Sequence, residues 1–124
     1  MSSLIQDWAT ANGLAASSNA AAGTLSFTID RVRVHLVPLQ GSETLVEARV
    51  RDLPAAPVER DRLLQKAMSI STARMAAVAA GPVVDQAASL LKLQARVPAH
   101  ASIDELDRAV SVMVNEVEFW RGML

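Results

Sequence analysis

The chain has 124 residues, of which 51% are hydrophobic and 20% charged, and its formal net charge is −1 at pH 7. This composition is typical of one folded domain over residues 1–124 and excludes a disordered chain. Cysteine is absent, which excludes disulfide bonds and zinc–thiolate sites. The sequence shows neither a membrane-spanning run nor a secretory leader, and its charge gives no general attraction to nucleic acid. We therefore expect a cytoplasmic protein that does not insert into membranes or bind nucleic acid.

A first helix is predicted from Ser2 or Ser3 to about Asn12, because serine is a favoured N-cap and Gly13 is well placed to end the helix. One face of this helix carries Leu4, Trp8 and Ala11, with Ile5 beside them. We expect Leu4 and Trp8 mainly in the core. Residues 15–23 are small and of low complexity, and they are expected to form a connection.

Alternating apolar residues then predict three strands, at Thr24–Asp30, Val32–Leu39 and Thr44–Arg51. The alternating apolar residues of the last two strands all have even numbers: Val32, Val34, Leu36, Val46, Ala48 and Val50. Since paired residues lie on the same face of a sheet, the loop between these strands must contain an odd number of residues. A three-residue loop at Gly41–Glu43 fits this condition, and a five-residue loop is the alternative.

The outer face of this hairpin is mostly arginine, with Arg33, Arg49 and Arg51 as its main members. The three-residue loop sets Arg33 opposite Arg51, and the five-residue loop sets it opposite Arg49. Like charges repel across a ladder, so an anionic neighbour is expected, and Glu47 can supply one. The face is either screened by solvent or a docking surface for an acidic stretch of a partner. Nucleic acid is the less favoured candidate ligand for this face because few aromatic residues are available to stack on bases.

The second half of the chain predicts a helix from about Val58 to Ile70, with Leu64, Ala67 and Met68 facing inward. The next stretch, Thr72–Ala80, is ambiguous. Its composition favours a helix, but Gly81 and Pro82 would stop one, and we favour a strand. A further strand is predicted at Ser89–Val97, where apolar and polar residues alternate.

The last helix, Ser102–Leu124, opens with a capping box formed by Ser102 and Glu105. Its core face is predicted to carry Ile103, Leu106, Val110, Met113, Val117 and Trp120. A second, smaller patch lies on another face, beside Glu105 and Glu116, and consists of Val112, Phe119 and Met123. This patch either touches another part of the domain, forms a homodimer contact or binds a partner.

The predicted class is α+β, in the order helix, three strands, helix, two strands, helix, with an antiparallel sheet packed against helices. No known catalytic or nucleotide-binding motif is present, and His35 and His100 show no ligand spacing. We therefore expect no catalytic residue, cofactor or metal site. A small hydrolase or transferase is the least favoured function.

Several stretches resemble, in the same order, the elements of the class I type III secretion chaperones. The stretch LIQDWATANGL resembles the opening helix, and FTIDRVRVHLVPL with LVEARVRDLP resembles the central hairpin. Similarly, RLLQKAMSIS resembles the second helix and SLLKLQARVP the last strand. The terminal helix of the family is similar to the stretch IDELDRAVSVMVNEVEFWRGML.

This resemblance implies a homodimeric chaperone without a catalytic site or cofactor. It would bind the extended N-terminal segment of a secreted effector, keep it unfolded and soluble and deliver it to the export apparatus, partly by strand addition. Leu4, Ile5 and Trp8 would line a binding groove. The dimer would form through the second helix and the following stretch, including Met68, Met75 and Val78. A non-secretion adaptor or regulatory domain of the same fold is the alternative.

Overall fold

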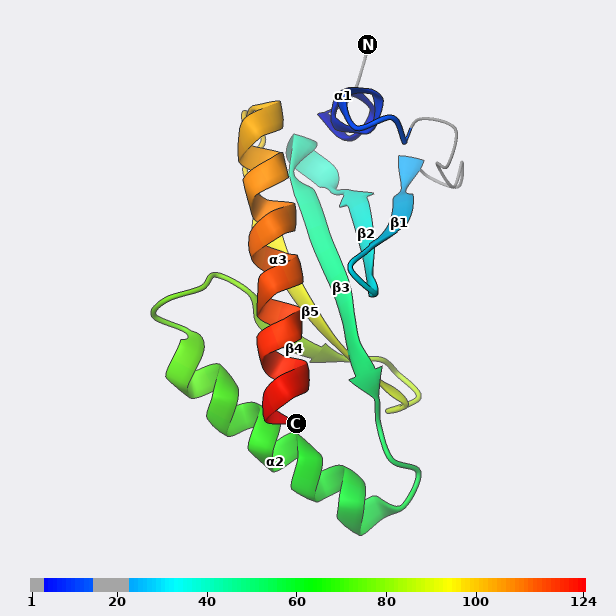
Figure 1. The fold of residues 1–124 in the computed structure, drawn as a ribbon, viewed down its shortest axis with the longest axis vertical. Helices are drawn as coiled ribbons and strands as arrows, with labels where there is room; N and C mark the ends of the chain where they lie inside the picture. The colour runs from blue at the N-terminus through cyan, green and yellow to red at the C-terminus, as the bar shows by residue number, and fades with distance from the viewer. Residues whose placement is uncertain (1–3, 15–22) are drawn as a thin grey trace.

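The computed structural model describes residues 4–14 and 23–124, and Figure 1 shows how its elements are arranged. In chain order these elements are α1 (Leu4–Ala11), β1 (Leu25–Ile29), β2 (Val32–Pro38), β3 (Thr44–Asp52), α2 (Pro57–Arg74), β4 (Gly81–Val84), β5 (Leu90–Val97) and α3 (Ile103–Met123). The predicted α+β class and element order are confirmed. The predicted caps Ser2 and Ser3, and residues 15–22 of the predicted connection, lie outside the described residues.

The five strands form one antiparallel sheet in the order β1-β2-β3-β5-β4. Strands β2 and β3 pair Pro38 with Thr44, which is the register of the five-residue loop, so the predicted loop at Gly41–Glu43 is wrong. The Leu39 amide donates to the Glu43 carbonyl at 2.8 Å and narrows the turn to residues 40–42. Gly41, with φ 76°, then sits at the centre of the turn, where a left-handed conformation is required.

The main core lies between α3 and one face of the sheet, where α3 packs on β2, β3 and β5 (Figure 1). The even-numbered apolar residues of β2 and β3 face this core, as predicted, and Val34, Leu36, Val46 and Ala48 are fully buried. Five of the six residues predicted on the core face of α3 are also buried. The exception is Ile103, which is 38% exposed because it begins the first turn of the helix.

Helix α2 continues through Arg74, so the strand predicted at Thr72–Ala80 is wrong. The helix-favouring composition of this stretch prevails, and the strand begins only at Gly81. Pro82 is tolerated within β4 because β4 is an edge strand that pairs only with β5 among the described strands. Met68 was predicted to face inward, but its side chain is 67% exposed. Helix α2 fully buries only its narrow inner face, at Ala67 and Ile70.

Helix α1 packs near the start of α3 (Figure 1), where Trp8 is 1% exposed. The Trp8 indole nitrogen donates to an Asp107 carboxylate oxygen at 3.1 Å, and its ring centroid lies 5.0 Å from that of Phe27. Gly13 follows the helix with a φ of 71°, which fits its predicted role in ending it. No helix in the described part of the chain is long and apolar enough to cross a membrane.

Candidate partner-binding surfaces

Large apolar side chains remain exposed on α2, β4 and α3, outside the core. On α3 they include the three residues of the predicted second patch: Val112 at 43%, Phe119 at 39% and Met123 at 45% exposed. On α2 and at the residue that caps its end they include Met68 and Met75, both predicted at a dimer interface. Exposed apolar groups that gather on neighbouring elements are typical of a surface that another molecule covers.

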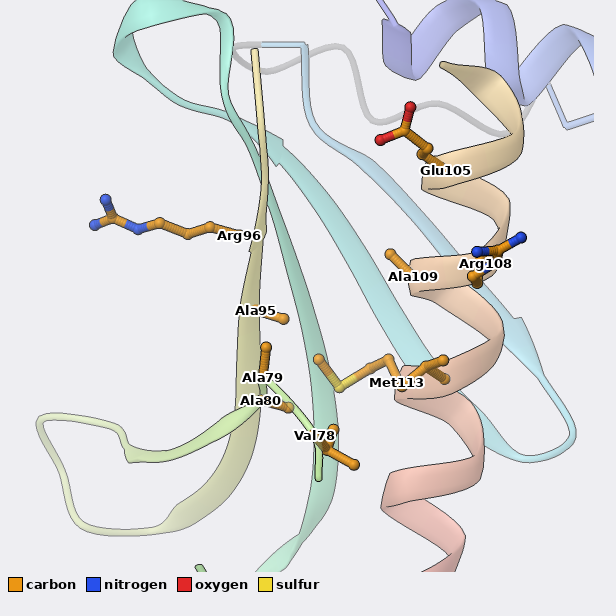
Figure 2. Close-up of a pocket in the computed structure, with 10 residues that line it drawn as sticks. Val78, Ala79, Ala80, Ala95, Arg96, Glu105, Arg108, Ala109 and Met113 are labelled. Carbon is orange, nitrogen blue, oxygen red and sulfur yellow. The ribbon is translucent and has the colours of Figure 1, made fainter. Parts of the chain in front are cut away.

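One pocket brings together Val78 and Val112, which were predicted on separate surfaces. The pocket has a volume of about 310 Å³ and is lined by Val78, Ala79, Ala80, Ala95, Arg96, Glu105, Arg108, Ala109, Val112 and Met113. It lies between the segment that precedes β4, strand β5 and the first half of α3 (Figure 2). Four alanines with short side chains leave this space open. We call it the Val78–Val112 pocket.

Most residues that line the Val78–Val112 pocket are apolar, and Arg96, Glu105 and Arg108 are the charged ones. Figure 2 shows the Met113 side chain extending from α3 towards the alanines that precede β4. In the same view, the side chains of Arg96 and Arg108 point outward, away from the space between the elements. This arrangement suits a bound molecule that places an apolar side chain in the pocket and keeps its polar backbone or charged groups outside it.

Beside the second patch, a buried carboxylate joins α3 to α2. Glu116 is 3% exposed and accepts two hydrogen bonds from Arg74, at 2.9 Å from Nε and 2.7 Å from Nη2. The Trp120 indole nitrogen donates a third bond to Glu116 at 3.2 Å. The hydrogen bonds from Arg74 hold the pKa of Glu116 below its usual value, against the opposing effect of burial.

The same arginine covers part of the second patch. The guanidinium carbon of Arg74 lies 4.3 Å from the centroid of the Phe119 ring, in a cation–π arrangement. The helical projection of the sequence predicts Glu116 beside this patch but does not identify its partner. A glutamate four residues before a core tryptophan was the available signal, because such a position lies near the buried face of the helix.

The predicted arginine face is exposed at Arg33, Arg49 and Arg51. The β2–β3 register, continued by one residue beyond the pair Val34–Ala48, sets Arg33 opposite Arg49. This is the arrangement that the five-residue loop predicts. The expected anionic neighbour, Glu47, instead binds Lys92 at 3.1 Å and Gln94 at 2.6 Å on β5.

On the same face, His35 is part of a polar row. Its ring nitrogen Nδ1 lies 2.6 Å from the Ser26 hydroxyl, and its strand neighbour on the other side is Glu47. Partial burial lowers the pKa of His35 below 6.5, and the nearby arginines and Lys92 act in the same direction, while Glu47 opposes them. The described residues contain no group of three or more His, Asp and Glu side chains placed to hold a metal ion.

The three α1 residues implied in a binding groove are placed differently from one another. Ile5 is 4% and Trp8 is 1% exposed, so both face the core of this chain. Leu4 is half-buried and keeps part of its side chain at the surface. A groove that uses Ile5 or Trp8 would require α1 to move, and the role of these residues stays a prediction.

Residues 3–121 match the model of the Tir chaperone protein (CesT) family. The match spans nearly the whole chain, and the chain therefore belongs to this chaperone family. The resemblance to type III secretion chaperones is thereby confirmed. No curated protein sequence matches the chain.

Several solved structures share the fold. The crystal structure of the ExsC–ExsE complex contains a chain with 20% identity and a TM-score of 0.75, over 98% of this chain and 90% of that one. A chain of the HopA1–SchA chaperone–effector complex has 17% identity and a TM-score of 0.69, over 96% of this chain and 91% of that one. The crystal structure of the Yersinia pestis type III secretion chaperone SycH, in complex with a stable fragment of YscM2, contains a chain with 18% identity and a TM-score of 0.63. The match covers 94% of this chain and 96% of that one.

Proposed function

We propose that residues 1–124 form one chaperone domain, which acts as a cytoplasmic homodimer and binds the extended N-terminal segment of a type III effector. The chaperone keeps this segment unfolded and soluble and delivers it to the export apparatus. Membership of the Tir chaperone protein (CesT) family is the observation that carries the proposal. The fold it shares with a chain of the HopA1–SchA chaperone–effector complex supports it.

The outer face of α2 supports the dimer. Met68 and Met75 lie two helical turns apart, which places them on one face, and they are 67% and 70% exposed. A second copy related by a two-fold axis would bury both residues against the same face of its own α2. Val78 follows shortly after α2 and is half-buried, so it would extend this surface towards the Val78–Val112 pocket.

The Val78–Val112 pocket supports the binding of an unfolded segment. An extended chain presents alternate side chains to a surface, so one apolar side chain can enter the pocket while its neighbours remain in water. The charged lining residues Arg96, Glu105 and Arg108 include both signs and suit a polar backbone beside the pocket. We propose that Val112, with Phe119 and Met123 further along α3, contacts the effector segment.

The sheet also offers an edge for strand addition. In the described sheet β1 and β4 are the edge strands. Strand β4 has only four residues and includes Pro82, which lacks a backbone N–H. Strand β1 contains no proline. We therefore propose that an added effector strand pairs with the free edge of β1, where no proline removes a backbone N–H.

Affinity capture from the native host, followed by limited proteolysis, tests the proposal. The full chain, carrying a tag, is expected to retain a secreted protein and to protect its N-terminal segment while the remainder of that protein is digested. The Phe119→Asp variant serves as the matched comparison. Recovery of folded domains alone would instead favour the adaptor, and recovery of no partner would contradict both.

A further inference from the structure

The ladder between β2 and β3 ends before the strands do. The last paired residues on this side are Val34 and Ala48, although β3 continues to Asp52. On its other side β3 stays paired with β5 as far as Asp52 and Leu90, with an irregularity between Arg49 and Arg51. The end of β3 therefore has one edge that none of the described strands covers.

The Arg121 side chain occupies this edge. Its guanidinium donates to the carbonyl oxygens of Val50 at 2.7 Å, Arg49 at 3.0 Å and Arg31 at 2.9 Å. It thus bridges β3 and the turn between β1 and β2, beside the point where the β2–β3 hydrogen bonds stop. None of the ion pairs among the described residues includes Arg121, so its positive charge is held in place without an acidic partner.

An open pocket of about 510 Å³ lies at this position, lined by Arg49, Val50, Arg51, Asp52 and Arg121. We call it the arginine slot. Three arginines face one aspartate there. Arg49 binds the Asp52 carboxylate at 3.1 Å, and Arg51 binds only the Asp52 carbonyl, at 3.0 Å. The Asp52 side chain is 80% exposed, so its ion pair is weakly held.

We infer that the arginine slot binds the carboxylates of an acidic stretch in the captured effector segment; this inference rests on the proposed chaperone function. Guanidinium groups match carboxylates in charge and in planar, two-pronged geometry. Asp52 already places one carboxylate on Arg49, which shows that such a group fits there. An incoming Asp or Glu displaces Asp52 from Arg49 and also reaches Arg51, which has no carboxylate of its own.

A protein segment fits the slot better than nucleic acid does. None of the residues lining the slot is aromatic, so it offers no ring on which a base could stack. Carboxylates spaced along an extended peptide can meet the arginines individually.

Fluorescence anisotropy with a labelled peptide tests the inference. The probe is a short peptide in which Glu and Ser alternate, and its neutral counterpart has Gln in place of Glu. We expect the full chain to bind the Glu peptide, the double variant Arg49→Gln/Arg51→Gln to bind it at least about tenfold more weakly, and added salt to weaken binding. Asp52→Asn should tighten binding because it removes the internal competitor.

The control variant is Arg62→Gln/Lys66→Gln on α2, which removes the same charge from two exposed positions that do not line the slot. It should bind the Glu peptide as the wild type does, and far-UV dichroism should show that every variant is folded. Equal binding of the Glu and Gln peptides, equal losses in both double variants, or weaker binding by Asp52→Asn would overturn the inference. Tighter binding of a single-stranded DNA oligonucleotide than of the Glu peptide would also overturn it.

The peptide assay and the affinity capture separate the two proposals. If the wild type binds the Glu peptide but captures no effector, the chaperone function fails and the slot is an acidic-peptide site without that role. If an effector is captured equally well by wild type and by Arg49→Gln/Arg51→Gln, and the Glu peptide does not bind, the slot inference alone fails.

Discussion

Arg74 and Glu116 form a two-pronged ion pair that joins the end of α2 to α3, with an Nη2–Oε2 distance of 2.7 Å. The Glu116 carboxylate is almost completely buried, whereas Arg74 stays about one-third exposed. Only Ala67 and Ile70 of α2 are fully buried, so the apolar packing of this helix is thin. The ion pair therefore has a large part in fixing the position of α2.

Replacing Arg74 should destabilise the domain more than neutralising its partner. Arg74→Met leaves a buried carboxylate without a cation, while Glu116→Gln keeps an uncharged acceptor for the Trp120 indole. We expect Arg74→Met to lower the Tm by more than Glu116→Gln does. The combined variant should be no less stable than Arg74→Met alone, since the two residues act as one unit. Thermal unfolding followed by circular dichroism at neutral pH measures all three, and strictly additive losses would contradict the expectation.

Acidification should weaken the fold through His35. Its pKa is lowered in the folded state, chiefly by burial, so the unfolded chain takes up the proton first as the pH falls. This contribution to stability is complete above pH 6.5 and is lost as the pH falls from 6.5 through the folded pKa, at no more than about 1.4 kcal/mol per pH unit. Urea unfolding at several pH values should show a flatter profile for His35→Gln than for wild type. His100→Gln is the control. An equally flat profile of stability against pH for His100→Gln would show that His35 is not the source of the effect.

A charge at Phe119 should separate binding from folding. Phe119 is 39% exposed beside Arg74, so Phe119→Asp is expected to keep its far-UV dichroism while weakening dimerisation or effector capture. Leu106→Asp should unfold the domain, because Leu106 is fully buried and an unpaired buried charge costs several kcal/mol, about the whole stability of a domain. Global unfolding by Phe119→Asp would show instead that this residue belongs to the core.

The dimer should depend on the outer face of α2. Met68→Lys/Met75→Lys is expected to raise the dimer dissociation constant roughly 100-fold or more, because two large apolar contacts on each protomer are replaced by charges. Helix content should not change, since both side chains are exposed in the single chain. Sedimentation equilibrium measures the constant, and Ala73→Lys, at an exposed position on a different face of the same helix, is the control. A monomeric wild type would end the dimer proposal.

The position of α1 should depend on the Trp8 indole. Trp8→Phe keeps an aromatic ring near Phe27 but loses the hydrogen bond to Asp107, and it should cost about 1–3 kcal/mol in urea unfolding. Asp107→Asn keeps an acceptor and should cost less. If Asp107→Asn costs as much as Trp8→Phe, the charge of Asp107 has a separate role.

The sequence predicted the sheet register only in part, for a geometrical reason. Even-numbered apolar residues in β2 and β3 required an odd loop, and the structure confirms that these residues share one face. Loops of three and five residues satisfy this condition equally, because both keep the same faces paired. The choice depends on the backbone of Gly41 and Ser42, which both take a positive φ. Alternation of apolar residues carries no information about that.

The features that the sequence did not predict depend on distant parts of the chain. A helical projection correctly separated the core stripe of α3 from the patch at Val112, Phe119 and Met123. It could not show that α2 covers Glu116, since Arg74 lies 42 positions away. Similarly, the three carbonyls bound by Arg121 belong to the far end of the sheet. Local periodicity describes one element, whereas polar contacts between elements depend on how those elements meet.

The strand order of the sheet has a consequence for how fast the chain folds. Three of its four pairings, β1–β2, β2–β3 and β4–β5, join strands that follow one another in sequence. The pairing of β3 with β5 instead requires the chain to close a loop that contains all of α2 and β4. Closing a long loop is an entropic cost that must be met before the contact stabilises the chain. We expect the β1–β2–β3 meander and the β4–β5 hairpin to form early, and their union through β3 and β5 to set the folding rate.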